Sequence, residues 1–419
     1  MPRRPVTRRP SSRVPSPGTA WTLLAAVGIV ALAFNLRPAA VSVGPVLDEV
    51  TAALGVGGAV GGVLTSLPVV AFAVFGATAP GAARRLGPHR VTVLALLAVV
   101  AGLLGRSLVD TPLPFLGLSL LALAGMAVSN VLLPSLVRRH FPHRIGALTA
   151  AYSTSLAIGL TLGSALTVPL AQALGGSVTD GWRWGLGAWA LVAAVAVLPW
   201  LVLARHDRRV EPDPDAAPLP VRVAVRRVAR TRLGWAMALF FGLQSLQAYV
   251  VFGWFAQLYR DAGFSPQVAG LLLGVITGVS IPLSVLVPVV AARMSDQRPL
   301  VVALTVCFLG GYTGLLVAPV GGAWLWAVLV GTGLCMFPLC LTLLGLRTCT
   351  AEGTAALSGF TQSVGYGIAV IGPIGIGVLH DRTGSWTAPL VVLLVLTVPQ
   401  LVVGLAAARP RLLEDELEG

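Results

Sequence analysis

The stretch "RHDRRVEPDPDAAPLPVRVAVRRVARTR" (205–232) decides how this chain of 419 residues is organised, because it is the longest polar segment between apolar runs. Six long apolar runs precede it and six follow it. Each run can cross a hydrocarbon core of about 30 Å as a helix that rises about 1.5 Å per residue. The sequence therefore predicts an all-α membrane protein with twelve transmembrane helices in two pseudo-symmetric six-helix bundles.

The limits of the expected spans follow from the polar breaks between the apolar runs. They are 20–47, 57–83, 91–109, 113–137, 145–174, 183–204, 233–259, 267–292, 299–318, 323–346, 354–379 and 387–408. The same breaks predict a disordered basic N-terminus (1–19), an N-terminal bundle (20–204), a linker (205–232), a C-terminal bundle (233–408) and a tail (409–419). The arginine-rich part of the linker favours either an amphipathic strip on an anionic membrane surface or a solvated loop.

The composition and the placement of charge agree with a membrane protein. Only 11% of the residues are charged and 56% are apolar, whereas a soluble domain carries about 25% charge. All 29 basic residues are arginine, and 24 of them lie in segments on one side of the expected spans. We expect a multi-pass protein of the bacterial cytoplasmic (inner) membrane, and the positive-inside rule then predicts that both termini lie in the cytoplasm. Because the net charge of +13 lies in short loops, we expect membrane lipid and no nucleic acid as a partner.

The two halves resemble each other at an offset near 208 residues. The matching pairs are Gly62 with Gly270, Pro80 with Pro288, Arg85 with Arg293, and Arg90 with Arg298. Duplicated six-helix units are typical of alternating-access transporters, whose solute site lies at the midplane between the repeats.

Arg37 is the deepest charge in the first span, within "ALAFNLRPAAVSVGPVLDEV" (31–50). A guanidinium in hydrocarbon costs about 2.5 kcal/mol or more, so it must face water or a partner. Pro38 removes a backbone donor and loosens the helix beside it. A fixed cation beside freed carbonyls suits a small polar or anionic solute in a water-filled cavity. The alternative is an interhelical pair with Asp48, Glu49 or backbone carbonyls.

Other polar side chains inside the spans are candidate cavity walls, because buried amides and phenols are costly unless they are wetted or partnered. The first and fourth spans offer Asn35 and Asn130, the seventh Gln244, Gln247, Tyr249 and Trp254, and the eleventh Gln362 and Tyr366. Helix packing through internal hydrogen bonds is the alternative for each of them.

Two cytoplasmic loops carry candidate gating residues. The loop "PGAARRLGPHR" (80–90) resembles a degenerate form of the loop that marks the major facilitator superfamily, with Arg85 in its pattern and Arg84 where an acid belongs. The second copy, "ARMSDQR" (292–298), holds Arg293 and keeps the acid as Asp296. In that family the acid is thought to clasp a helix end at the inner gate.

Several stretches together resemble the cyanate/2-nitroimidazole transporter family of the major facilitator superfamily. They are "NLRPA" (35–39), "NVLLPSLVRRHFP" (130–142), "FGLQSLQAYVVFGWFAQLYRDAGFSPQVAGLL" (241–272) and the segment 337–386. The resemblance implies a facilitator fold and a small planar or anionic solute. By position, the resemblance also implies that seven residues line the cavity: Asn35, Arg37, Asn130, Gln244, Tyr249, Gln362 and Tyr366.

We therefore expect a monomeric secondary or facilitative transporter that uses alternating access. Export of amphipathic drugs by the same superfamily is the alternative. The spans hold no nucleophile–base set and no metal cluster, so neither an enzyme nor a cofactor is expected. Acidic residues near the spans lie at their outer ends, so proton coupling would run through His380 or a gate carboxylate, or transport would run without a coupling proton.

Overall fold

The computed structural model describes residues 19–205 and 226–418, and within them every regular element is a helix. Within the described residues, twelve helices or runs of consecutive helices are long and apolar enough to cross a membrane, so the prediction of twelve spans is confirmed. The predicted N-terminal segment and most of the predicted linker lie outside the described residues.

The N-terminal half comprises the first six spans and their short connecting helices. They are α1 (Thr19–Asn35), α2 (Pro38–Val41), η1 (Gly44–Val46), α3 (Leu47–Leu54), α4 (Gly58–Phe75), η2 (Gly76–Thr78), α5 (Ala79–Leu86), α6 (Pro88–Arg106), α7 (Pro112–His140), α8 (Ile145–Gly175) and α9 (Val178–Ala204).

The C-terminal half comprises the other six spans, several of which are broken in the middle, and a short terminal helix. They are α11 (Arg232–Asp261), α12 (Pro266–Gly278), α13 (Ser280–Arg293), α14 (Arg298–Val317), α15 (Ala323–Gly333), α16 (Met336–Leu346), α17 (Ala351–Ala369), α18 (Ile371–Thr383), α19 (Thr387–Ala407) and α20 (Leu413–Glu418). The helix α20 lies in the segment that the sequence predicts only as a tail.

Two span limits differ clearly from the prediction. The first span continues through α2, η1 and α3 to Leu54, because the breaks at Pro38 and Pro45 interrupt the helix without ending the apolar run. The second span is shorter than predicted and ends at Phe75, where η2 and the proline at the start of α5 turn the chain.

The first span breaks directly beside Arg37. Pro38 has no N–H, and the amides of Ala40 and Val41 both bond to the Arg37 carbonyl, at 3.0 and 3.2 Å. Arg37 itself is the residue before α2, with φ −111° and ψ −40°. The Arg37 side chain therefore projects from a short irregular segment and not from a continuous helix.

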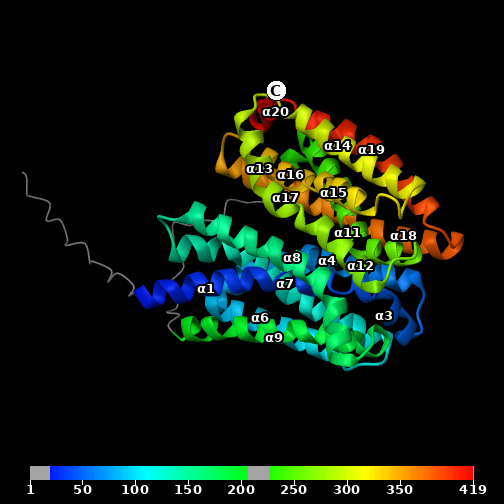
Figure 1. Cartoon of the computed structure of the whole chain (residues 1–419). Helices are drawn as coiled ribbons and strands as arrows, with labels where there is room; N and C mark the ends of the chain where they lie inside the picture. The colour runs from blue at the N-terminus through cyan, green and yellow to red at the C-terminus, as the bar shows by residue number, and fades with distance from the viewer. Residues whose placement is uncertain (1–18, 206–225, 419) are drawn as a thin grey trace, which may run out of the picture.

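Figure 1 shows α1–α9 and α11–α20 as two bodies that meet near α3, α4, α12 and α18. We call this end the distal side, and the opposite end, where α9 finishes and α11 begins, the linker side. On the distal side α4 packs on α18 and α8 packs on α12. A Cβ at Gly253 of α11 would lie 2.6 Å from Cβ of Thr65, so the two halves approach each other there more closely than a larger residue would allow. The distal side is therefore closed.

Candidate functional site

Arg37 lies half-buried at the contact between the halves. Within the described residues its guanidinium has no hydrogen bond or ion pair. The alternative pairing with Asp48 or Glu49 is wrong in this structure, because both carboxylates contact Arg260 instead. In the part of the chain that the structure describes, the Arg37 guanidinium is thus an unpaired cation that could bind a solute.

A small enclosed cavity adjoins Arg37. Its lining comes from both halves and consists of Arg37, Ala40, Val41, Gly44, Thr65, Leu160, Tyr249, Phe252 and Gly253. Its volume of about 20 Å³ is enough for about one water molecule. Any larger solute at this place requires the halves to move apart, so occupancy of the cavity depends on the relative position of the halves.

Two phenols lie within electrostatic range of Arg37. Its positive charge acts on both the Tyr249 and the Tyr366 hydroxyls. Tyr366 stacks on Phe72 of α4 with ring centroids 5.8 Å apart, and it meets Phe241 edge-on at 5.1 Å. The structure thus brings together three of the predicted cavity residues, Arg37, Tyr249 and Tyr366, beside an aromatic wall that spans both halves.

Three predicted residues of the seventh span do not line this cavity. Gln244 donates to the Leu334 carbonyl at 2.9 Å, and Gln247 donates to the Gln400 side chain. Trp254 donates its indole N–H to the Pro373 carbonyl at 3.0 Å. All three are buried, and their bonds stay within the C-terminal half, so they act as packing elements in this structure.

The remaining predicted polar residues also lie away from the cavity lining. Asn35 is buried and donates to the Ala31 carbonyl at 2.8 Å and to the Val192 carbonyl of α9 at 3.4 Å. Gln362 donates to the Ser358 hydroxyl one turn earlier on α17, at 2.7 Å. Asn130 is half-buried on α7. Asn35 therefore connects α1 and α9 by a hydrogen bond, which agrees with the alternative that it serves helix packing.

Thr65 and Phe252 line the cavity although the sequence did not single them out. The Thr65 hydroxyl bonds back to the Gly61 and Gly62 carbonyls, both at 3.1 Å, which is an ordinary helical arrangement. A threonine or phenylalanine in an apolar run carries no signal of its own, so only the packing of the halves identifies these two residues.

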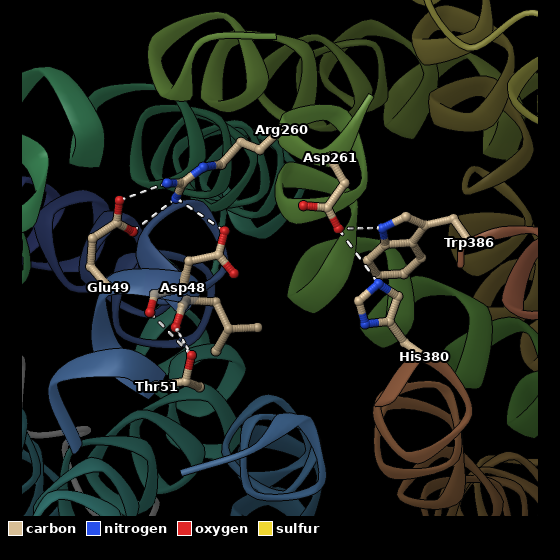
Figure 2. Close-up of polar contacts among 8 residues, drawn as sticks. Asp48, Glu49, Thr51, Arg260, Asp261, His380 and Trp386 are labelled. Carbon is tan, nitrogen blue, oxygen red and sulfur yellow. Dashed lines mark hydrogen bonds and ion pairs between the residues drawn. The ribbon is translucent and has the colours of Figure 1, made fainter. Parts of the chain in front are cut away.

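The distal side carries an ion-pair cluster that joins the halves (Figure 2). Arg260, at the end of α11, donates two hydrogen bonds of 2.8 Å to the Glu49 carboxylate of α3. Its Nη1 also lies 3.5 Å from an Asp48 oxygen. The side chains of Arg260 and Glu49 are only 19% and 6% exposed, so this pair is shielded from water. Two parallel N–H···O bonds fix the relative position of both helices.

A second polar contact joins the halves beside this cluster. The Asp381 carboxylate of α18 accepts the Ala59 amide at 3.1 Å, at the N-terminus of α4. A carboxylate at a helix N-terminus is favoured by the helix dipole. Next to it in the chain, His380 lies 3.5 Å from Asp261, whose carboxylate also accepts the Trp386 indole N–H at 2.7 Å (Figure 2).

The predicted gating residues of the linker side make no such contact in the described part of the chain. Arg85 and Arg293 are exposed. Asp296 pairs with Arg298 of its own half, at 2.5 Å, and the hydrogen bond from Arg298 lowers the pKa of the Asp296 carboxyl. The contacts between the halves that involve charged side chains thus gather on the distal side, and the Ser66 hydroxyl of α4 adds a neutral hydrogen bond of 3.0 Å to the Val370 carbonyl. Within the described residues, no group of three His, Cys, Asp or Glu side chains could hold a metal ion.

Comparisons with known proteins agree with this architecture. Residues 23–373 match the model of the Major Facilitator Superfamily. The chain is 37% identical to the "Uncharacterized transporter YycB" of Bacillus subtilis (strain 168), over 92% of this chain and 93% of that protein. It is 35% identical to the "2-nitroimidazole transporter" of Escherichia coli (strain K12), over 92% and 95% of the two chains. Identity to "Cyanate transport protein CynX" of the same organism is 30%, over 85% and 90%.

Solved structures extend the likeness to the fold. A bacterial homolog of the human lysosomal transporter Spinster, in an inward-facing and unoccupied conformation, matches with a TM-score of 0.75 at 15% identity, covering 96% of this chain and 99% of that one. The D-xylose–proton symporter matches with a TM-score of 0.70 at 15% identity, covering 95% and 98%.

Proposed function

The chain belongs to the Major Facilitator Superfamily, and from that premise we propose that it moves a small polar or anionic solute across the bacterial cytoplasmic membrane by alternating access. The proposal rests above all on Arg37, a half-buried cation with no partner within the described residues that lines a cavity between the halves. A guanidinium presents several donors in one plane and so matches a planar anion or amide.

The names of two relatives support this class of solute. One relative is named for 2-nitroimidazole, a small planar polar ring, and another for cyanate, a small linear anion. Tyr249 and Tyr366 add hydroxyls and aromatic faces near the Arg37 charge, so a flat solute would find both a cation and a stacking surface. An amphipathic drug needs a wide apolar cavity and gains nothing from a fixed cation, so we do not favour the exporter alternative.

The arginine distribution supports an orientation with the linker side in the cytoplasm. In that orientation the Arg260–Glu49 pair closes the outer side. Separation of this pair, with closure at the linker side, then gives the second state of the transport cycle.

The test is transport in proteoliposomes with cyanate and 2-nitroimidazole, with and without a pH gradient. We expect Arg37→Ala to raise the KM for the transported solute at least about tenfold, because hydrogen bonds to charged groups contribute at that scale. Arg37→Lys should lie between Ala and wild type, since lysine keeps the charge but not the planar fork. Arg411→Ala is the matched control, because Arg411 is exposed, lies outside the cavity lining and is not a candidate gating residue.

Equal KM values for wild type and Arg37→Ala would overturn the role of Arg37. Transport of amphipathic cations, with no uptake of either small solute, would favour the drug exporter instead.

A further inference from the structure

A second arginine, Arg106, lies completely buried at the end of α6. Its Nη1 donates to the Ala39 carbonyl at 3.2 Å and its Nη2 to the Ser42 hydroxyl at 3.0 Å. Within the described residues no carboxylate pairs with it, and its Nε has no partner. A buried cation without a counter-ion is costly, so its retention calls for a specific task.

Both acceptors belong to the break in the first span that begins at Arg37. In a continuous helix the Ala39 carbonyl would accept the amide of the residue four positions later, but here the chain turns away after α2. The Arg106 guanidinium donates to that freed carbonyl and to the hydroxyl of Ser42, which is fully buried three residues further on. It therefore satisfies the backbone that the break leaves open.

The other side of the break is held by packing. A Cβ at Gly163 of α8 would lie 3.0 Å from Cα of Pro38 and 2.9 Å from a methyl group of Val41, so α8 presses directly on α2. The segment is thus fixed between α6 and α8. Arg37 and the cavity residues Ala40 and Val41 all lie on it.

We propose that Arg106 is a positioning residue of the solute site, which holds the broken segment so that Arg37 faces the cavity. This inference rests on the proposed function, since it assigns Arg106 a task in solute recognition. The planar guanidinium explains why arginine is suited to this position, because its separate N–H groups reach two acceptors on different turns. The compact ammonium group of a lysine does not span the same two acceptors.

The experiment measures KM and Vmax for cyanate in proteoliposomes, and hydrogen exchange of the backbone amides in the segment 38–43, of which Pro38 has none, in the purified protein. We expect Arg106→Gln and Arg106→Lys to raise KM about tenfold with little change in Vmax, because displacement of a binding group weakens binding. Both variants should also speed exchange at 38–43. Ser42→Ala removes one of the two acceptors and should shift both quantities in the same direction by a smaller factor.

The matched control is Arg183→Lys. Arg183 donates to the Val109 carbonyl at 2.8 Å, near the same end of α6, but does not touch the break. A double variant, Arg37→Ala with Arg106→Gln, separates positioning from general stability. If Arg106 acts through Arg37, the second change adds nothing to the KM of Arg37→Ala.

Unchanged exchange at 38–43 in both Arg106→Gln and Ser42→Ala overturns the inference, whatever the solute. A raised KM in Arg37→Ala with a normal KM in Arg106→Gln also overturns it but leaves the proposed function intact. Failure of wild type to move either small solute, with altered exchange in the variants, counts against the proposed function and keeps the structural role of Arg106.

Discussion

Replacing Arg260 with glutamine should open the distal side of this transporter. Arg260 is the one basic partner of Glu49 and Asp48 in the described cluster, and it joins α11 of one half to α3 of the other. The variant leaves the shielded Glu49 carboxylate beside Asp48 without a cation. Moving the halves apart lets water reach both groups, so the open state becomes relatively more favourable.

The size of the shift follows from burial. Loss of one partner costs about 3–5 kcal/mol in a fully buried pair and about 0–1 kcal/mol in an exposed pair. The side chains here are 19% and 6% exposed, which lies between these limits. We therefore expect about 2 kcal/mol, which corresponds to a shift of about 30-fold in the ratio of distal-closed to distal-open molecules.

The three residues should rank in a definite order. Glu49→Gln keeps the Asp48 contact of 3.5 Å and should shift the ratio less than Arg260→Gln. Asp48→Asn should have the smallest effect, since the Asp48 side chain is 31% exposed and lacks the paired 2.8 Å bonds. A double variant with both Glu49→Gln and Arg260→Gln should be less perturbed than the sum of the single variants.

The assay is double electron–electron resonance between spin labels at Ala53 of α3 and Ser385 after α18, with the four native cysteines replaced. Both labelled positions are exposed on the distal side. Asp110→Asn is the control, because the Asp110–Arg183 pair of 2.5 Å lies within one half. An unchanged distance distribution in Arg260→Gln, or an equal change in Asp110→Asn, would refute the idea that this pair holds the halves together.

Three further predictions concern packing, the tail and the buried amides. Gly62→Val should block distal closure, because a Cβ there would lie 2.7 Å from the Pro373 carbonyl, and we expect a long spin-label distance and little transport. Burial would raise the pKa of the Glu414 carboxyl, but hydrogen bonds from the amides at the start of α17 lower it overall. Docking of α20 should therefore be stable above the ordinary pKa of 4.5 and be lost as the pH falls through the lowered value, and Glu414→Gln should show faster hydrogen exchange at 349–353 even at neutral pH. Gln400→Leu should lower the unfolding free energy by about 1–3 kcal/mol, since Gln247 then loses its acceptor, whereas Gln247→Leu with Gln400→Leu should recover most of this loss and leave the KM unchanged.

The sequence predicts the fold well because the signals that define it are long. Apolar runs and arginine-rich loops mark twelve spans in two halves, and the described part of the structure contains twelve such spans.

The site is only partly predictable from the sequence. Arg37 stands out because a charge in an apolar span is costly. The sequence offered Glu49 only as an alternative partner of Arg37, whereas the structure pairs Glu49 with Arg260. Gln244 and Gln247 are amides in an apolar span, as residues that line a cavity would be, yet both form hydrogen bonds within the C-terminal half. Helical periodicity gives the face of a residue on its own helix, but not which neighbour covers that face.

The proposed solute cavity and the distal ion pair share two structural elements, so movement at one is coupled to movement at the other. The first span runs from Arg37 through α2 and η1 to Glu49, and α11 runs from Tyr249 to Arg260. Opening the ion pair therefore separates the same two elements that line the cavity. A solute can shift this equilibrium only through a difference in its affinity for the two states. The cavity of about 20 Å³ excludes a solute larger than water while both elements stay in contact, so such a solute binds only when they part at the level of Arg37. Solute binding and separation of the two halves at Arg37 are then two descriptions of one step.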